Sequence, residues 1–146
     1  MDWQSNLITT RDGVRELLRG VKRIAVLGME KDENSDRPAY YVPKYRMDAG
    51  YEIVPVPAKY PGLEKTAGLK AYATVAEIPG DVDLVNVFRR PADVARHVDD
   101  ILAKKPRAVW LQLGIRDDVA AERWARAGIL VVQDRCLMVD HQRLMR

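Results

Sequence analysis

Five runs of apolar residues recur along the chain, and each is rich in Val, Ile, Leu or aromatic residues. Most neighbouring positions within a run are apolar, so the runs lack the strict alternation of a half-exposed strand. A near-continuous apolar run is typical of a strand that is covered on both faces. The predicted strands lie within residues 22–29, 51–57, 82–88, 107–113 and 129–132.

Segments with helical periodicity separate these runs. Thr10 can cap a first helix whose apolar residues share one face, and Gly20 ends that helix. Pro38 suits the first position of a second helix that reaches Gly50, in which Pro43 removes one hydrogen bond. Further helices are predicted over residues 91–105, from Asp117 or Asp118 to Gly128, and around 139–144, whereas residues 60–79 are less regular.

Strands and helices that alternate five times predict right-handed crossovers and a parallel sheet with helices on both faces. The expected fold class is therefore α/β, a Rossmann-like doubly wound five-stranded parallel sheet with strand order 3-2-1-4-5. In such a sheet a ligand binds beyond the carboxyl ends of the strands, where the strand order reverses. The length of 146 residues predicts one domain over residues 1–146, with an N-terminal helix in residues 1–20 packing on it.

Composition and charge exclude several classes of function. The chain has 24 Lys and Arg against 21 Asp and Glu, and these charges are interspersed, which argues against a nucleic-acid partner. A single cysteine excludes an internal disulfide framework, and two histidines without ligand spacing argue against a metal centre. The first residues, MDWQSN, do not resemble a signal peptide, and no run is long enough to span a membrane. We therefore expect a cytoplasmic protein without a membrane partner, whose oligomeric state stays open, a homo-oligomer included.

The residues that follow the first two strands are candidates for ligand binding. Gly28 either lets the backbone approach a ligand closely or serves a tight turn, and no standard dinucleotide or Walker glycine motif surrounds it. Pro57 and Lys59 follow the second strand, where an NAD enzyme usually carries an acidic residue for the ribose hydroxyls. A rigid apolar wall beside a positive charge suits a base next to a phosphate-bearing ribose, and an ordinary surface lysine is the alternative.

The ends of the third and fourth strands carry polar candidates. Arg89 and Arg90 directly precede a helix, where cations do not stabilise the helix dipole, so we expect them to bind an anion. Pairing with a carboxylate such as Asp93 is the alternative. Gln112 can both donate and accept hydrogen bonds, and Gly114 permits close approach of a ligand.

Cys136 follows the fifth strand, on the same edge of the predicted sheet. If it is exposed there, the neighbouring Arg135 favours its thiolate, which could form a mixed disulfide with a ligand thiol. The alternative is a buried thiol that packs under the final helix. His97 and His141 have no serine or cysteine partner in the sequence pattern and are expected to be structural or surface residues.

Five segments in order resemble the small stand-alone CoA-binding protein family. They run from about Val21 to Leu144, nearly the whole chain. The segments are RPAYYVPKY (37–45), GYEIVPVPAK (50–59), VDLVNVFRRP (82–91), VWLQLGIR (109–116) and VVQDRCLMVDHQRL (131–144). The domain is also similar to the CoA-binding domain of the succinyl-CoA synthetase α subunit, whose strand-end loops hold the nucleotide half of CoA.

The resemblance implies an arrangement of the site residues around coenzyme A. Gly28 and Met29 would lie beside the diphosphate with Arg37 nearby, and Pro57 and Lys59 would flank the adenosine and its 3′-phosphate. Phe88, Arg89 and Arg90 would line the other side of the nucleotide, and Gln112 to Gly114 would close the crevice toward the pantetheine. The first loop departs from a phosphate site because it is acidic, which leaves open a counter-ion or an outward-facing loop tip; its acidic residues are Glu30, Asp32, Glu33 and Asp36.

We therefore expect the chain to bind coenzyme A or an acyl-CoA without catalysis. A ligase similar to succinyl-CoA synthetase would need a phosphorylatable histidine on a mobile loop and a partner domain, and this chain offers neither placement nor length. One alternative is an NAD(H)-binding regulatory module, which predicts an acidic residue after the second strand. The other is an enzyme that acts on a CoA thioester through Cys136 or Arg135.

Overall fold

The computed structural model describes residues 2–145, so Met1 and Arg146, the ends of the expected domain, lie outside the described residues. Five strands form one parallel sheet, and each lies inside a predicted apolar run. The predicted α/β fold class is confirmed. The strands are β1 (Arg23–Leu27), β2 (Glu52–Val56), β5 (Leu84–Val87), β6 (Ala108–Leu111) and β7 (Leu130–Val132).

The predicted strand order 3-2-1-4-5 is wrong. The sheet runs β2-β1-β5-β6-β7, which is 2-1-3-4-5 when these five strands are counted along the chain. Pro55 lies in the middle of β2 and has no N–H to donate, and such a proline belongs on an edge strand rather than in the interior of a sheet. On the outer side of β2, the carbonyl of Pro55 accepts a hydrogen bond from the N–H of Tyr72 (3.0 Å). The order therefore reverses between β1 and β5, which moves the expected binding edge to the ends of these two strands.

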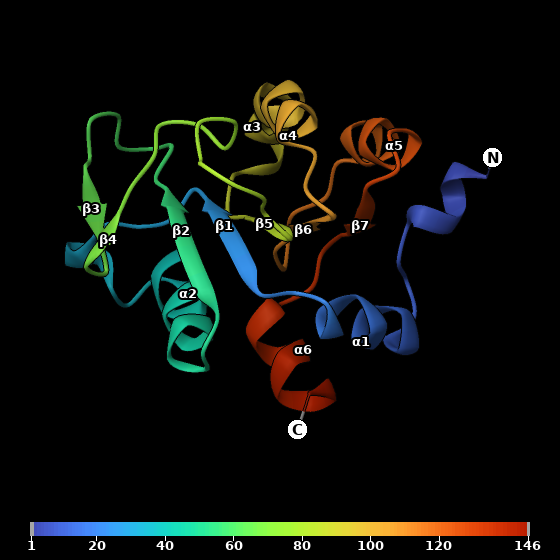
Figure 1. Cartoon of the computed structure of the whole chain (residues 1–146), viewed down its shortest axis with the longest axis horizontal. Coiled ribbons are helices and arrows are strands. Elements are labelled where there is room, and N and C mark those ends of the chain that lie inside the picture. The colour runs from blue at the N-terminus through green and yellow to red at the C-terminus, as the bar shows by residue number, and fades with distance from the viewer. Residues whose placement is uncertain (1, 146) are drawn as a thin grey trace.

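Helices cover both faces of the sheet (Figure 1). The helix predicted over residues 91–105 is divided by a 3₁₀ turn at Ala95–His97. One face carries α1 (Arg11–Arg19), α2 (Pro38–Asp48) and α6 (Leu137–Leu144), and the other carries α3 (Pro91–Val94), α4 (Val98–Lys104) and α5 (Asp118–Arg126).

Three smaller elements complete the fold. Two strands of two residues each, β3 (Lys65–Thr66) and β4 (Leu69–Lys70), form a hairpin beyond β2 (Figure 1). The hairpin lies in the region without a regular sequence pattern. Two 3₁₀ turns, η1 (Trp3–Asn6) and η2 (Asp32–Asn34), precede α1 and α2. The hairpin matters for the site because it packs beside the loop that follows β1.

Each face of the sheet has its own apolar core. Val14, Leu17 and Leu18 of α1 are buried in the core that also holds α2 and α6, and the side chain of Thr10 caps α1 by accepting from the N–H of Gly13 (3.0 Å). Trp124 of α5 is fully buried in the opposite core. None of the helices within residues 2–145 combines the length and the apolar character needed to cross a membrane.

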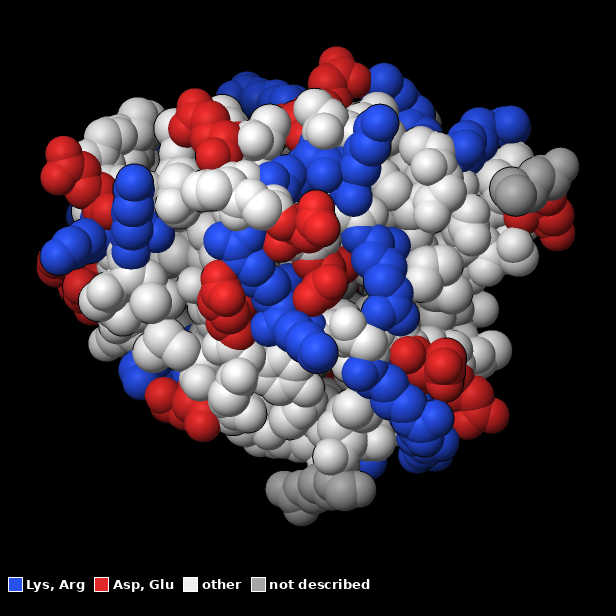
Figure 2. All heavy atoms as spheres, viewed as in Figure 1, with Lys and Arg blue, Asp and Glu red and all other residues white. Residues whose placement is uncertain are grey.

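Charged side chains of both signs interleave on the surface. On the face shown in Figure 2, Lys and Arg alternate with Asp and Glu, and no broad area carries one sign. This agrees with the interspersed charges of the sequence. On this face, a charged ligand would therefore meet a local arrangement of side chains rather than a broad area of one sign.

Candidate functional site

A cleft of about 320 Å³ opens at the carboxyl edge of the sheet. Its walls come from the loop after β1, the start of α2, and the residues that follow β2, β5 and β6. The structure brings six of the ten predicted site residues together there: Arg37, Lys59, Phe88, Arg89, Arg90 and Gln112. Glu30, Leu113 and Ile115 also line it.

Gly28 and Met29 lie beneath the cleft rather than in its wall. Gly28 has φ +90°, and a Cβ atom there would lie 2.2 Å from the carbonyl oxygen of Phe88. The close backbone approach that requires glycine is therefore made between the ends of β1 and β5. The side chain of Met29 is buried in the core under α2, so only its backbone can face a ligand.

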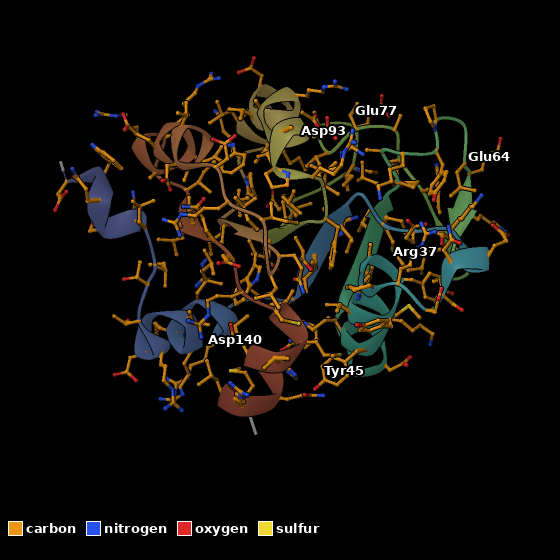
Figure 3. The ribbon with its side chains drawn as sticks, turned by 180° about the vertical axis from the view of Figure 1, so that it is seen from behind. Arg37, Tyr45, Glu64, Glu77, Asp93 and Asp140 are labelled. Atoms are coloured by element: carbon orange, nitrogen blue, oxygen red, sulfur yellow. The ribbon has the colours of Figure 1, made fainter. Side chains whose placement is uncertain are left out.

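Pro57 lines a second hollow, of about 690 Å³, on the outer side of β2. The rings of Tyr60 and Tyr72 and the β3–β4 hairpin form part of its wall, which also includes Glu64, labelled in Figure 3. The hydroxyl of Tyr60 donates to Oε2 of Glu30 (2.7 Å), which lines the cleft. The hollow and the cleft therefore share a wall.

Glu30 is the centre of a hydrogen-bonded cluster in the cleft, and it is only 1% exposed. Its Oε2 accepts from Tyr60 and from Nδ2 of Asn34 (2.9 Å). Its Oε1 accepts from Nη1 of Arg37 (3.2 Å) and lies 3.7 Å from Nζ of Lys59. Burial raises the pKa of this carboxyl, but the hydrogen bonds from Tyr60, Asn34 and Arg37 and the charge of Lys59 outweigh burial and lower the pKa from 4.5 to about 2.

Local chain geometry fixes the position of Glu30. Pro43 has no N–H for the carbonyl of Ala39, four residues earlier in α2, and that carbonyl instead accepts from the N–H of Glu30 (3.1 Å). On the other side, the hydroxyl of Thr66 in β3 donates to the carbonyl oxygen of Glu30 (2.8 Å). The proline in α2 and the hairpin therefore hold the residue that pairs with the cations of the cleft.

The acidic loop combines both alternatives left open by the sequence. Glu30 is a counter-ion, whereas Glu33 and Asp36 are exposed. Asp32 connects the loop to the hairpin and to α2, because its Oδ1 accepts from the N–H of Ala67 (2.8 Å) and from the hydroxyl of Tyr40 (2.9 Å). These hydrogen bonds lower the pKa of Asp32. Two of the four partners of Glu30 come from the segment between β1 and α2 and two follow β2, so the acidic loop was only a partial signal for its role.

Arg89 and Arg90 line the cleft and also pair with Asp93, so both interpretations of these residues meet in the structure. Nε of Arg90 donates to Oδ2 of Asp93 (2.8 Å), and Nη2 of Arg89 lies 3.9 Å from the same oxygen. Arg96 also approaches Asp93, at 3.7 Å. Asp93 lies at the start of α3 (Figure 3), and its hydrogen bond from Arg90 lowers its pKa.

The two arginines differ in exposure. Arg90 is largely exposed, whereas Arg89 is nearly buried and its Nε donates to Nε2 of His97 (3.2 Å). Burial, followed by the charge of Arg89, lowers the pKa of His97. Arg90 is therefore the more accessible cation on this side of the cleft, and Arg89 also contributes to the packing of the α3 region.

The end of β6 provides an amide and an apolar surface. Oε1 of Gln112 accepts from Nδ2 of Asn86 (3.3 Å) and from the N–H of Leu137 (3.4 Å), which leaves its amide nitrogen as the donor on the cleft side. Leu113 is 66% exposed and adds an apolar side chain to the cleft wall. The N–H of Gly114 donates to Oδ1 of Asp134 (2.6 Å), and this residue does not line the cleft.

Cys136 and the histidines lie outside the cleft wall. Cys136 precedes α6 and is partly buried against the core under that helix. The guanidinium of Arg135 donates to both carboxylate oxygens of Asp140 (2.6 and 2.9 Å), a residue labelled on α6 in Figure 3. Among residues 2–145, no group of three or more His, Cys, Asp or Glu side chains could hold a metal ion.

Comparison with known proteins identifies the family of this chain. The chain matches the CoA binding domain family over residues 22–142, which include all five strands of the sheet. It is 35% identical over 128 residues to the uncharacterized protein YneT of Bacillus subtilis strain 168, covering 88% of this chain and 91% of that protein.

Solved structures of similar proteins cover almost the same length of the chain. A protein from Thermus thermophilus is 42% identical with a TM-score of 0.85, covering 93% of this chain and 99% of its own. A hypothetical protein from Pyrococcus horikoshii OT3 is 31% identical with a TM-score of 0.82, covering 94% of both chains. With its matched family, its parallel sheet and its cleft at the β1 and β5 ends, the chain belongs to the CoA-binding domain family.

Proposed function

We propose that this chain binds coenzyme A or an acyl-CoA in the cleft at the carboxyl ends of β1 and β5. The observation that carries the proposal is the composition of the cleft: cations from two sides face an exposed apolar residue, Leu113, at the end of β6. Coenzyme A has the same division between a phosphate-rich nucleotide and a long pantetheine arm. Residues 1–146 act in this proposal as one binding domain, and the N-terminal helix supports the sheet.

Each part of the ligand has a corresponding group of residues. Arg37 and the start of α2 suit the diphosphate, since the dipole of a helix is positive at its N-terminus. Lys59 stands between the cleft and the hollow lined by Pro57 and Tyr60, which suits a 3′-phosphate beside an adenine. Arg90 flanks the nucleotide from the opposite side of the cleft.

The pantetheine arm would follow the end of β6. The amide of Gln112 can bind its polar groups, and Leu113 and Ile115 offer apolar contact. The described side chains that line the cleft include no Ser, Thr, Cys or His. This composition favours binding without catalysis over an enzyme that attacks a thioester through Cys136.

The position of the acidic residue argues against an NAD(H) module. Such a module is expected to offer a carboxylate after β2 to the hydroxyls of a ribose. Here Lys59 occupies that region, and the buried carboxylate of Glu30 follows β1. Four donors already surround its two oxygens, which leaves little acceptor capacity for a ribose.

Calorimetric titration with coenzyme A, dephospho-CoA and NAD tests the proposal. If Lys59 contacts the 3′-phosphate, coenzyme A should bind about 10–100-fold more tightly than dephospho-CoA, as expected for a hydrogen bond between charged groups. Lys59→Gln should remove that difference, whereas Lys44→Gln, an exposed change on α2 where Lys44 pairs with Asp48, should preserve it. Tighter binding of NAD than of coenzyme A would overturn the proposed function.

A further inference from the structure

The cations that face β1 and β2 already have an anionic partner within the protein. We propose that Glu30 competes with the phosphate groups of the ligand for Arg37 and Lys59, and thereby sets the affinity of the cleft for anions. The inference deepens the proposed function and rests on it, because it assumes that phosphate groups enter this cleft.

The carboxylate of Glu30 divides its contacts between its two oxygens. Oε2 accepts from the neutral donors Tyr60 and Asn34, at 2.7 and 2.9 Å. Oε1 faces both cations, with Nη1 of Arg37 at 3.2 Å and Nζ of Lys59 at 3.7 Å. An arriving phosphate oxygen would therefore replace the contacts of a single carboxylate oxygen.

The partners of Oε1 are also free to move toward a ligand. Glu30 is 1% exposed, but the side chains of Arg37 and Lys59 are 56% and 41% exposed. Both cations thus extend from a buried anion into solvent, and their long side chains can turn outward. Glu30 cannot follow them, because its backbone N–H is bonded to Ala39 and its carbonyl to Thr66.

This arrangement lets the two cations move from Glu30 to a ligand phosphate, but the move costs binding free energy. After the cations turn to a ligand, Tyr60 and Asn34 still satisfy Oε2, so the buried carboxylate keeps part of its hydrogen bonding. The low pKa of Glu30 keeps it negative at neutral pH, so it would also repel the incoming phosphate. The cleft therefore binds anions less tightly than its cations alone would allow.

Glu30→Gln tests the proposal, because glutamine has the same shape and no charge. Titrations with coenzyme A, inorganic pyrophosphate and adenosine should be compared in the unaltered protein and the variant. Pyrophosphate and coenzyme A should bind at least about tenfold more tightly to E30Q, the lower end of what one charged hydrogen bond contributes. The affinity for adenosine, which has no charge, should not change.

Glu33→Gln is the matched control, since it removes the same charge from an exposed residue of the same loop. An equal gain of pyrophosphate affinity in E33Q would show that only the net charge matters, and would overturn the proposal. Unchanged or weaker pyrophosphate binding by E30Q would also overturn it. So would a failure of both proteins to bind pyrophosphate. If pyrophosphate shows the expected gain but coenzyme A binds to neither protein, the proposed function fails while the role of Glu30 stands.

A measurement on the unaltered protein keeps the proposal testable if E30Q does not fold. Pyrophosphate should shift the side-chain ¹⁵N resonances of Arg37 and Lys59 as these groups leave Glu30. The resonance of Arg126, which pairs with Glu122 on α5, should stay in place. Unmoved resonances of Arg37 and Lys59 at saturating pyrophosphate would contradict the proposal.

Discussion

Two of the charged side chains that are buried among the described residues, Glu30 and Arg46, have opposite surroundings. Glu30, at the carboxyl edge of the sheet, is 1% exposed and lies within reach of four donors. Arg46, in α2, is 0% exposed, and Nε, Nη1 and Nη2 of its guanidinium have no hydrogen-bond partner among the residues that the structure describes. Its guanidinium carbon lies 3.6 Å from the centre of the Tyr51 ring.

Aromatic groups take the place of a counter-ion around Arg46. His141 of α6 meets the rings of Tyr45 and Tyr51 edge-on, at 5.6 and 5.5 Å, and its Nδ1 shares a hydrogen bond with the Tyr45 hydroxyl (3.0 Å). Burial lowers the pKa of Arg46, and Tyr51 only partly offsets this. Figure 3 shows Tyr45 away from Arg37, toward the other end of α2.

Glu30 is a buried charge with hydrogen-bond partners at the candidate site, whereas Arg46 is a buried charge whose guanidinium nitrogens lack such partners among the described residues. A buried charge is tolerated when hydrogen bonds and opposite charges satisfy it, and is destabilising when they do not. Glu30 meets this condition, and its two cationic partners, Arg37 and Lys59, line the cleft. Arg46 does not, and stacking on Tyr51 recovers only part of the lost hydration.

The largest expected effect concerns the stability that Glu30 contributes. Its pKa falls from 4.5 to about 2 on folding, so its contribution is fully present above pH 4.5 and is lost as the pH falls toward 2. This shift corresponds to about 3 kcal/mol at neutral pH. E30Q should therefore be less stable than the unaltered protein at pH 7, and the difference should shrink between pH 4.5 and 2.

Urea unfolding at several pH values measures this difference. E33Q, with its exposed side chain, should follow the unaltered protein at every pH. Parallel stability curves for E30Q and the unaltered protein, with a constant offset, would show that the charge of Glu30 is not what its partners stabilise.

The second effect is a gain in the free energy of unfolding when Arg46 is replaced, whereas the replacement of Glu30 lowers it. Arg46→Leu removes an unsatisfied buried charge from a position beside Val42 in α2. Replacing a buried ion pair with apolar residues of similar volume is neutral or stabilising by about 1–4 kcal/mol, and we expect a charge without a partner to follow the same direction. We expect a gain near the lower end, about 1 kcal/mol, because the cation–π contact with Tyr51 is lost as well. Arg19→Leu on the exposed surface of α1 is the control and should change the unfolding free energy by less than about 0.5 kcal/mol. A less stable R46L protein would mean that stacking outweighs the missing hydrogen bonds.

The sequence predicts the strands and the helix caps because these depend on local patterns. Thr10 and Asp117 cap their helices as their residue types suggest. The strand order depends on long-range pairing, and the prediction missed the one local signal for it, the proline inside β2. Counting that proline as an edge marker would have favoured the observed order.

The cations of the site were predictable, and so was Asp93 as an alternative partner of Arg89 and Arg90, but the role of Glu30 was not. Lys59, Arg89 and Arg90 follow strands, and the topology of a parallel sheet gathers strand ends at one edge. Asn34 and Arg37 lie four and seven residues after Glu30, but Lys59 and Tyr60 come from the segment after β2, and no local spacing reveals that they meet Glu30. The burial of Arg46 did leave a signal, because it lies four residues after the buried Val42 on the same side of α2.

The smallest expected effect reports directly on Arg46. Burial lowers the pKa of His141 from 6.5, and the charge of Arg46 lowers it further. The unfolded chain therefore binds a proton at His141 more readily than the folded protein, so stability falls as the pH drops below 6.5. R46L removes the charge but not the burial, so the pKa of His141 should rise part of the way toward 6.5 in this variant.

NMR titration of the two histidines measures this change within one sample. His97 provides the internal control, because its pKa is lowered by burial and by Arg89 at the other edge of the sheet, and R46L should leave it unchanged. If the His141 titration does not move, the guanidinium of Arg46 exerts no field at this site. The charge of Arg46 would then be screened despite its lack of hydrogen-bond partners among the described residues. Arg46 and Glu30 would then differ in their hydrogen bonds but not in the electrostatic effect of an unpaired charge.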